Sequence, residues 1–161
     1  MQGANPQQTS YVPDSPHSLE GKLVRSLDLG LATHSTPAVV GGVIYIGGNF
    51  KVTAIDVNTG QTLWEKPTTG PVHGTPAVAG TMLYLGLLDK HLLALDLESG
   101  ALRWDFKADS PFPGSVAVDS GIVYAGSQDG HVYALDAGSG RLIWKLGTGA
   151  SVVPPPAVYE G

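Results

Sequence analysis

Three aspartates recur at a fixed interval and are the first candidates for chemistry. Asp56, Asp96 and Asp136 are spaced 40 residues apart, and evenly repeated carboxylates could serve acid/base catalysis or bind calcium. Each, however, begins the same motif, Asp-x-x-Thr/Ser-Gly, in which a carboxylate can accept hydrogen bonds from turn amides and a glycine can adopt a positive φ. The glycines are Gly60, Gly100 and Gly140. Because each motif belongs to a separate repeat, the aspartates should lie far apart, and a structural role is favoured.

Two histidines offer a second candidate site. His34 and His73 each lie two residues before a Thr-Pro pair, at the entrance to an innermost strand, so both should sit at the same end of the fold near its central axis. Two imidazoles there could share a metal or another ligand. The next two repeats have Pro113 and Val153 at this position, so no ring of ligands exists. We favour the interpretation that the two histidines are polar residues lining the mouth of a channel along that central axis.

Phe112 lies between Pro111 and Pro113 and has two interpretations of equal standing. It is either an exposed anchor for a protein partner or a side chain that packs over the channel mouth. The sequence contains no Gly-x-Ser-x-Gly nucleophile motif, and its glycine-rich stretches lie in hairpins rather than before a helix that could cradle phosphate. The sequence therefore predicts no catalytic, cofactor-binding or metal-binding residues.

Composition excludes several classes of protein. The chain has 161 residues, 42% hydrophobic and 14% charged, which is typical of a folded domain and not of a disordered chain. Its net charge of −5 with nine Lys and Arg argues against a nucleic-acid partner. The absence of cysteine excludes disulfides, zinc-thiolate sites and iron–sulfur clusters. No targeting segment and no stretch long and apolar enough for a membrane span is evident in the sequence.

The elements that must position these residues come from a repeat of 39–40 residues. In its third copy we expect strands at 115–118, 122–127, 131–136 and 141–146, separated by turns such as Gln128-Asp129-Gly130. Four short antiparallel strands in each copy are typical of a propeller blade. A sandwich or barrel would not need the same side chains at the same offsets.

A tryptophan closes each copy of the repeat, four residues after the turn glycine. Trp64, Trp104 and Trp144 fall on the outermost strands, where an indole placed between neighbouring blades could bury its ring and donate its N–H to a backbone carbonyl. Alanines at 54, 94 and 134 are small where close packing is needed, and tyrosines at 45, 84 and 124 are expected to fill the core.

The recurring Ala-x-Asp-x-x-Thr/Ser-Gly-x-x-x-Trp pattern resembles the tryptophan-docking motif of the PQQ-like repeat, named after pyrroloquinoline-quinone dehydrogenases. The resemblance, to quinoprotein-type, BamB-like β-propellers, covers residues 19–161. WD-repeat propellers are disfavoured because Trp104-Asp105 is the only Trp-Asp pair.

The repeat is out of phase with the ends of the chain. We expect an all-β fold with blades at about 31–67, 71–107 and 111–147, a lone outer strand at about 21–27 and a lone inner strand at about 153–159. Residues 1–18 are polar and proline-bearing and are expected to form an extended N-terminal arm. The chain would then be an incomplete propeller ring whose open end faces favour association with other protein chains, further blades of a parent protein, or another copy of itself.

The resemblance implies three functional hypotheses. The first is a non-catalytic scaffold or protein–protein interaction module of a bacterial envelope or multi-subunit complex, on the periplasmic or extracellular face. The second is a ligand-sensing extracellular domain that uses His34, His73 and Phe112. The third is a fragment of a PQQ-dependent dehydrogenase with calcium, although the family's enzymes carry a vicinal cysteine pair and long insertions that this chain lacks. We favour the first.

Overall fold

The computed structural model describes residue 26 and residues 32–158, and the described residues form twelve strands. The first sheet contains β1 (Ala38–Val40), β2 (Val43–Gly47), β3 (Lys51–Asp56) and β4 (Thr62–Pro67). The second contains β5 (Ala77–Ala79), β6 (Met82–Gly86), β7 (His91–Asp96) and β8 (Leu102–Lys107). The third contains β9 (Ala117–Asp119), β10 (Ile122–Gly126), β11 (His131–Asp136) and β12 (Leu142–Gly147).

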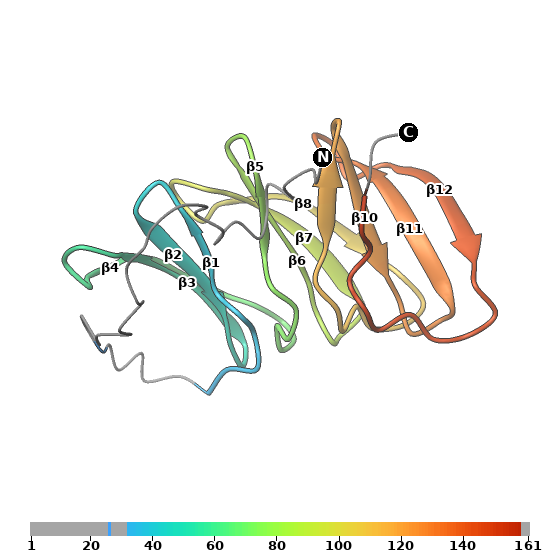
Figure 1. Cartoon of the computed structure of the whole chain (residues 1–161), viewed down its shortest axis with the longest axis horizontal. Coiled ribbons are helices and arrows are strands. Elements are labelled where there is room, and N and C mark those ends of the chain that lie inside the picture. Colours follow the sequence, from blue (N-terminus) through green and yellow to red (C-terminus); the bar gives the residue numbers. More distant parts are fainter. Residues whose placement is uncertain (1–25, 27–31, 159–161) are drawn as a thin grey trace, which may run out of the picture.

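Each sheet is an antiparallel meander whose strands pair in chain order. The three sheets follow one another along the long axis of Figure 1, and the short strands β1, β5 and β9 approach one another from sheet to sheet. Consecutive four-stranded sheets with adjacent innermost strands are the architecture of a β-propeller. The described part of the chain contains no helix. The predicted all-β, incomplete propeller is therefore confirmed, with three four-stranded antiparallel blades.

Local sequence explains why the strands turn where they do. Ser120 and Gly121 have φ of +47° and +77°, the paired positive values of a tight hairpin between β9 and β10. The register between the third and fourth strands shifts at the same place in every sheet, after Ala54, Ala94 and Ala134. A shift of this kind leaves one extra residue on the outer strand and increases the local twist.

The predictions of the two lone strands have different outcomes. The expected outer strand at 21–27 and the arm at 1–18 lie outside the described residues, apart from Ser26, which is not in a strand. The described part of the expected inner strand, residues 153–158, does not form a strand, which corrects that detail. The innermost strands β1, β5 and β9 each pair with the following strand of their own sheet, and residues 153–158 have no such following strand among the described residues.

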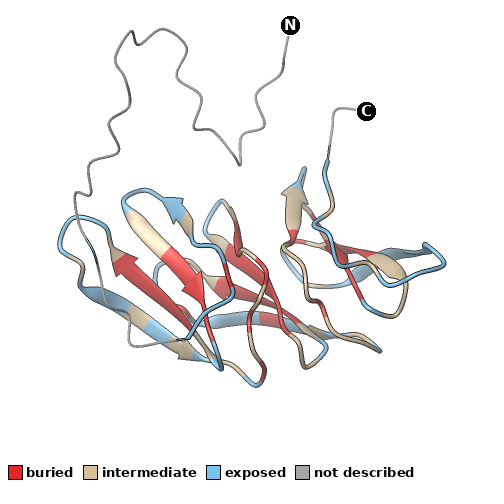
Figure 2. Cartoon of the chain, turned by 60° about the horizontal axis from the view of Figure 1, so that its bottom comes forward, coloured by how far each residue is buried: buried red, intermediate tan, exposed pale blue. Residues whose placement is uncertain are grey.

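Two hydrophobic cores lie between consecutive sheets. One face of the first sheet packs on the second through residues that include Tyr45, Ala54 and Leu95, and one face of the second packs on the third through Tyr84, Trp104 and Leu135. In the second sheet, residues of one core alternate with residues of the other, as the two-residue period of a strand requires: Leu83 and Leu85 face the first sheet, and Tyr84 between them faces the third. Figure 2 shows this burial concentrated within the sheets, with exposed residues at the turns and outer strands. A blade face is thus buried where another blade covers it.

Candidate functional site

One ladder of side chains recurs across the same face of every sheet. In register, Ala38, Tyr45, Ala54 and Trp64 lie side by side in the first sheet. The second sheet has Ala77, Tyr84, Ala94 and Trp104, and the third has Ala117, Tyr124, Ala134 and Trp144. We call this the tryptophan face. Each tyrosine ring lies 5.8–5.9 Å from its tryptophan ring, tilted by 41–48°.

The first two tryptophan faces are covered by the turn of the next blade. Trp64 Nε1 donates a 3.2 Å hydrogen bond to the Leu97 carbonyl, and Trp104 Nε1 donates a 2.9 Å bond to the Ala137 carbonyl. The tyrosine hydroxyls of Tyr45 and Tyr84 donate to the same two carbonyls, at 3.3 and 3.1 Å. Both acceptors directly follow the repeated aspartate, so each turn receives two donors from the preceding blade.

The turn glycines allow the indoles to approach the backbone. A Cβ on Gly100 would lie 2.7 Å from the Trp64 ring, and one on Gly140 would lie 2.6 Å from the Trp104 ring. Both glycines also have φ near +70°, where side chains other than glycine are strained. Trp104 is only 8% exposed. Trp64 is more exposed and lines a groove of about 490 Å³ between the first two blades.

Each repeated aspartate bonds within its own turn. The Oδ1 atoms of Asp56, Asp96 and Asp136 accept hydrogen bonds of 2.6–2.9 Å from the amide and hydroxyl of the residue three positions later. Hydrogen bonds from Ser99 and then from Arg103 hold the pKa of Asp96 well below its usual range, and bonds from Ser139 lower the pKa of Asp136. A carboxylate held ionised in this way is a poor general acid or base at neutral pH.

His34 and His73 are brought together. Their ring centroids are 4.9 Å apart with planes tilted by 54°, and they enter β1 and β5, as the repeat predicts. His34 is exposed and His73 is partly exposed. In residue 26 and residues 32–158, no group of three or more His, Cys, Asp or Glu side chains converges on a metal-sized site.

Phe112 is fully buried, so the expectation of an exposed partner anchor is wrong. Its ring packs edge-on against Tyr133 at 5.6 Å, and a Cβ added to Gly86 would lie 2.6 Å from Phe112 Cβ. Its amide donates a hydrogen bond to the Leu87 carbonyl of the preceding blade. These contacts place the ring in the core between the second and third blades.

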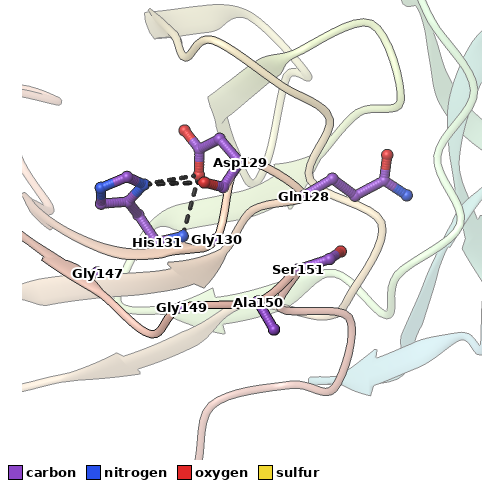
Figure 3. Close-up of a pocket in the computed structure, with 8 residues that line it drawn as sticks. All are labelled: Gln128, Asp129, Gly130, His131, Gly147, Gly149, Ala150 and Ser151. Atoms are coloured by element: carbon purple, nitrogen blue, oxygen red, sulfur yellow. Dashed lines mark hydrogen bonds and ion pairs between the residues drawn. The ribbon is translucent and has the colours of Figure 1, made fainter.

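A polar cluster at the end of the third blade was missed from the sequence. It borders an open hollow of about 400 Å³ formed by residues 128–131 and by Gly147, Gly149, Ala150 and Ser151, drawn in Figure 3. Asp129 accepts hydrogen bonds from the His131 amide at 3.1 Å and from the Tyr133 hydroxyl at 2.5 Å. The signal in the sequence was the pair His131 and Tyr133, which lie two residues apart on β11 and share one face, with Asp129 in the turn just before that strand.

The ionisation of this cluster favours a structural role. Burial raises the pKa of Asp129, but hydrogen bonds from Tyr133 and Ser127 outweigh it and leave the pKa below the usual value. Burial, followed by the bond to Asp129, raises the pKa of Tyr133. An ionised carboxylate and a neutral phenol hold the Asp129 turn closed. No catalytic proton transfer follows from this arrangement.

The described residues do not fit a PQQ–calcium centre. Calcium needs several converging oxygen ligands. The repeated aspartates each bond within a separate turn, and Asp129 is engaged by Tyr133 and His131. No cluster of carboxylates converges in the part of the chain that the structure describes.

The architecture, the repeated turns and the tryptophan faces define a β-propeller built from PQQ-like repeats. The chain belongs to the family described as outer membrane protein assembly factor BamB, whose model matches residues 15–151. No curated protein matches the chain.

Several solved structures share the fold. BamB from Moraxella catarrhalis is 23% identical with a TM-score of 0.63, over 70% of this chain and 36% of that one. A quinohemoprotein alcohol dehydrogenase, ADHIIG from Pseudomonas putida HK5, is 28% identical with a TM-score of 0.66, over 75% and 21%. The computationally designed protein Ika4 is 19% identical with a TM-score of 0.74, over 83% and 85%.

BamB and the dehydrogenase share the fold of this chain, so the fold alone does not decide whether the chain is an enzyme. The chain spans about a third of the BamB chain and about a fifth of the dehydrogenase chain. Among the described residues, no helix is long and apolar enough to cross a membrane.

Proposed function

We propose that this chain is a non-catalytic β-propeller module that binds other protein through the tryptophan face of its third blade. Membership of a family described as an outer membrane protein assembly factor supports a role in a bacterial envelope complex, on its periplasmic side. The engagement of the repeated aspartates and of Asp129 in structural hydrogen bonds supports a role without catalysis or a cofactor.

The single observation that carries the proposal is the exposure of Trp144. Its side chain is 42% exposed, and Leu146, two residues along β12, is 62% exposed. All six residues of β12 are exposed, whereas Trp104 at the equivalent place in the second blade is buried. A large exposed apolar face on a regular sheet marks an interaction surface.

The two covered faces indicate what such a partner must present. Tyr124 and Trp144 have the same mutual geometry as the covered pairs. Neither side chain donates a hydrogen bond within the part of the chain that the structure describes. In the covered faces, the carbonyls of Leu97 and Ala137 accept these hydrogen bonds. By analogy, the partner supplies an exposed backbone carbonyl with a glycine close to it. The Asp-x-x-Ser/Thr-Gly turn of a similar blade has both.

Sedimentation velocity over a range of concentrations tests the proposal. The unchanged chain is expected to associate as its concentration rises, because the uncovered face favours burial. Trp144→Glu and Leu146→Glu should abolish association. Leu102→Glu is the matched control, since Leu102 is also an exposed outer-strand leucine, 48% exposed, in the second blade.

Two results would contradict the proposal. The first is an unchanged chain that sediments as a monodisperse, cooperatively folded monomer throughout. The second is association that survives both Trp144→Glu and Leu146→Glu. Circular dichroism of each variant establishes that the blades remain folded.

A further inference from the structure

We propose that His34 and His73 form a two-imidazole binding site for a borderline transition-metal ion such as Ni²⁺, Cu²⁺ or Zn²⁺. The pair lies where the chain enters the first and second blades and does not belong to the tryptophan face. The proposal is independent of the proposed function, because either can fail without the other.

The distance between the rings matches a shared ion. Imidazole nitrogens bind zinc at about 2.0–2.1 Å, so two imidazoles on one ion at angles of about 90–110° have centroids roughly 4.5–5.3 Å apart. The observed centroid distance is 4.9 Å, with a tilt of 54°. The observed separation of the two rings therefore falls within the range for two imidazoles that share one ion.

The backbone on both sides of the pair is fixed. Thr33 Oγ1 donates to the Gly47 carbonyl and accepts from the Ser35 amide. The buried Ser35 Oγ then donates a 2.9 Å bond to the Gly74 carbonyl, joining the two histidine segments directly. The cost of bringing two ligands together is therefore largely met by the fold before an ion binds.

On the second segment, Val72 is fully buried, and its amide donates to the Gly48 carbonyl. A Cβ on Gly74 would lie 2.2 Å from the Gly114 carbonyl oxygen, so this segment is held tightly on both sides of His73. The two rings thus project from anchored backbone.

The fold itself does not require histidine at this position. The equivalent residues in the next two repeats are Pro113 and Val153, which have neither the size nor the polarity of an imidazole. The entry to a blade therefore does not need an imidazole for packing, and the two facing rings can serve to bind a ligand.

The donor set selects the class of ion. Two neutral imidazole nitrogens suit Zn²⁺, Cu²⁺ and Ni²⁺, whereas Ca²⁺ and Mg²⁺ prefer oxygen ligands. No third His, Cys, Asp or Glu joins the pair among residue 26 and residues 32–158. The remaining coordination positions would be occupied by water or by a group from a bound molecule, as in an open site.

Retention of the untagged chain on nickel-chelate resin, followed by calorimetric titration with Ni²⁺ and Cu²⁺, tests the site. The unchanged chain should be retained and bind one ion. His34→Ala and His73→Ala should each weaken the affinity by at least about tenfold. Changing a residue that only hydrogen-bonds to a metal ligand already costs about that much, and these variants remove a ligand itself. His34→Gln and His73→Gln provide replacements of similar size.

His91→Ala and His131→Ala are the matched controls. His91 Nδ1 lies 2.7 Å from Asp105 Oδ1, and His131 Nδ1 lies 3.3 Å from Asp129 Oδ1, so each imidazole already has a carboxylate partner. Both controls should bind nickel as the unchanged chain does. Absence of binding, or binding that survives His34→Ala and His73→Ala, would overturn the proposal, and thermal unfolding of each variant separates lost ligands from lost folding.

Discussion

The covered and uncovered tryptophan faces of this molecule are built from the same residues but have opposite surroundings. Trp104 is buried, and its indole N–H is bonded to Ala137. Trp144 has the same neighbours within its sheet, yet lies in an outer strand whose residues are all exposed. The comparison shows that the ladder is formed within one blade, whereas burial and hydrogen bonding come from the next. Under the proposed function, the ladder of the third blade is a binding surface that is already formed before its partner binds.

The largest expected difference concerns the tryptophans themselves. Trp104→Ala removes a buried ring and its hydrogen bond and should lower the free energy of unfolding by roughly 3–5 kcal/mol. Trp144→Ala removes an exposed ring from a monomeric chain and should lower it by less than about 1 kcal/mol. Urea unfolding at low protein concentration measures both. Equal losses would mean that Trp144 is as well packed as Trp104.

The turn glycines sharpen the comparison at the next level. Gly140→Ala places a methyl group 2.6 Å from the Trp104 ring at a φ of +71°, and should cost about 2–3 kcal/mol from overpacking and strain together. Gly121→Ala has a similar φ of +77° but no atom within 4 Å, so it should cost only about 1 kcal/mol. If the two variants unfold at the same urea concentration, contact with the indole contributes nothing.

The tyrosine hydroxyls give a smaller effect. Tyr84→Phe removes the 3.1 Å bond to the Ala137 carbonyl and should cost about 1 kcal/mol. Tyr124→Phe changes a side chain with no hydrogen bond within the described residues and should stay within about 0.5 kcal/mol of the unchanged chain. Thermal unfolding of the two variants side by side measures the difference, and an equal cost would show that Tyr124 already has an acceptor.

The smallest effect is a dependence of stability on pH. Because folding lowers the pKa of Asp96 and of Asp136, their contribution is complete above the unfolded value of about 3.9 and declines as the pH falls below it. Asp96→Asn should flatten this decline more than Asp136→Asn, since Arg103 also donates to Asp96 at 2.6 Å. Urea unfolding between about pH 5 and pH 2.5 tests this. An unchanged slope in Asp96→Asn would contradict it.

Much of the fold could be predicted from the sequence because the pattern of one blade occurs three times in it. Turn glycines, alternating strand residues and the recurring tryptophan are local patterns, and in the third copy of the repeat they place β10, β11 and β12 within one residue. What failed depends on tertiary surroundings. Phe112 was ambiguous because prolines fix the backbone but not the direction of burial. Residues 153–158 carry the pattern of an innermost strand, but a strand needs a neighbour to pair with.

In the candidate sites, too, the features set by local sequence could be predicted, and those set by tertiary surroundings could not. The meeting of His34 and His73 at one end follows from their equal positions in the repeat, but the 4.9 Å distance between their rings depends on how the blades pack. The bond between Asp129 and Tyr133 was missed because the second blade has Leu93 at the tyrosine position, so no repetition drew attention to it.

Iodide quenching of single-tryptophan variants most directly tests the claim that the third tryptophan face is an open binding surface. One variant retains Trp144 alone, through Trp64→Phe and Trp104→Phe, and the other retains Trp104 alone, through Trp64→Phe and Trp144→Phe. At a concentration where sedimentation shows a monomer, Trp144 emission should be strongly quenched and Trp104 emission weakly quenched, and Trp144 should become protected as the chain associates. Trp144 emission as protected as that of Trp104 in the monomer, or quenching of Trp144 that does not change on association, would contradict the account.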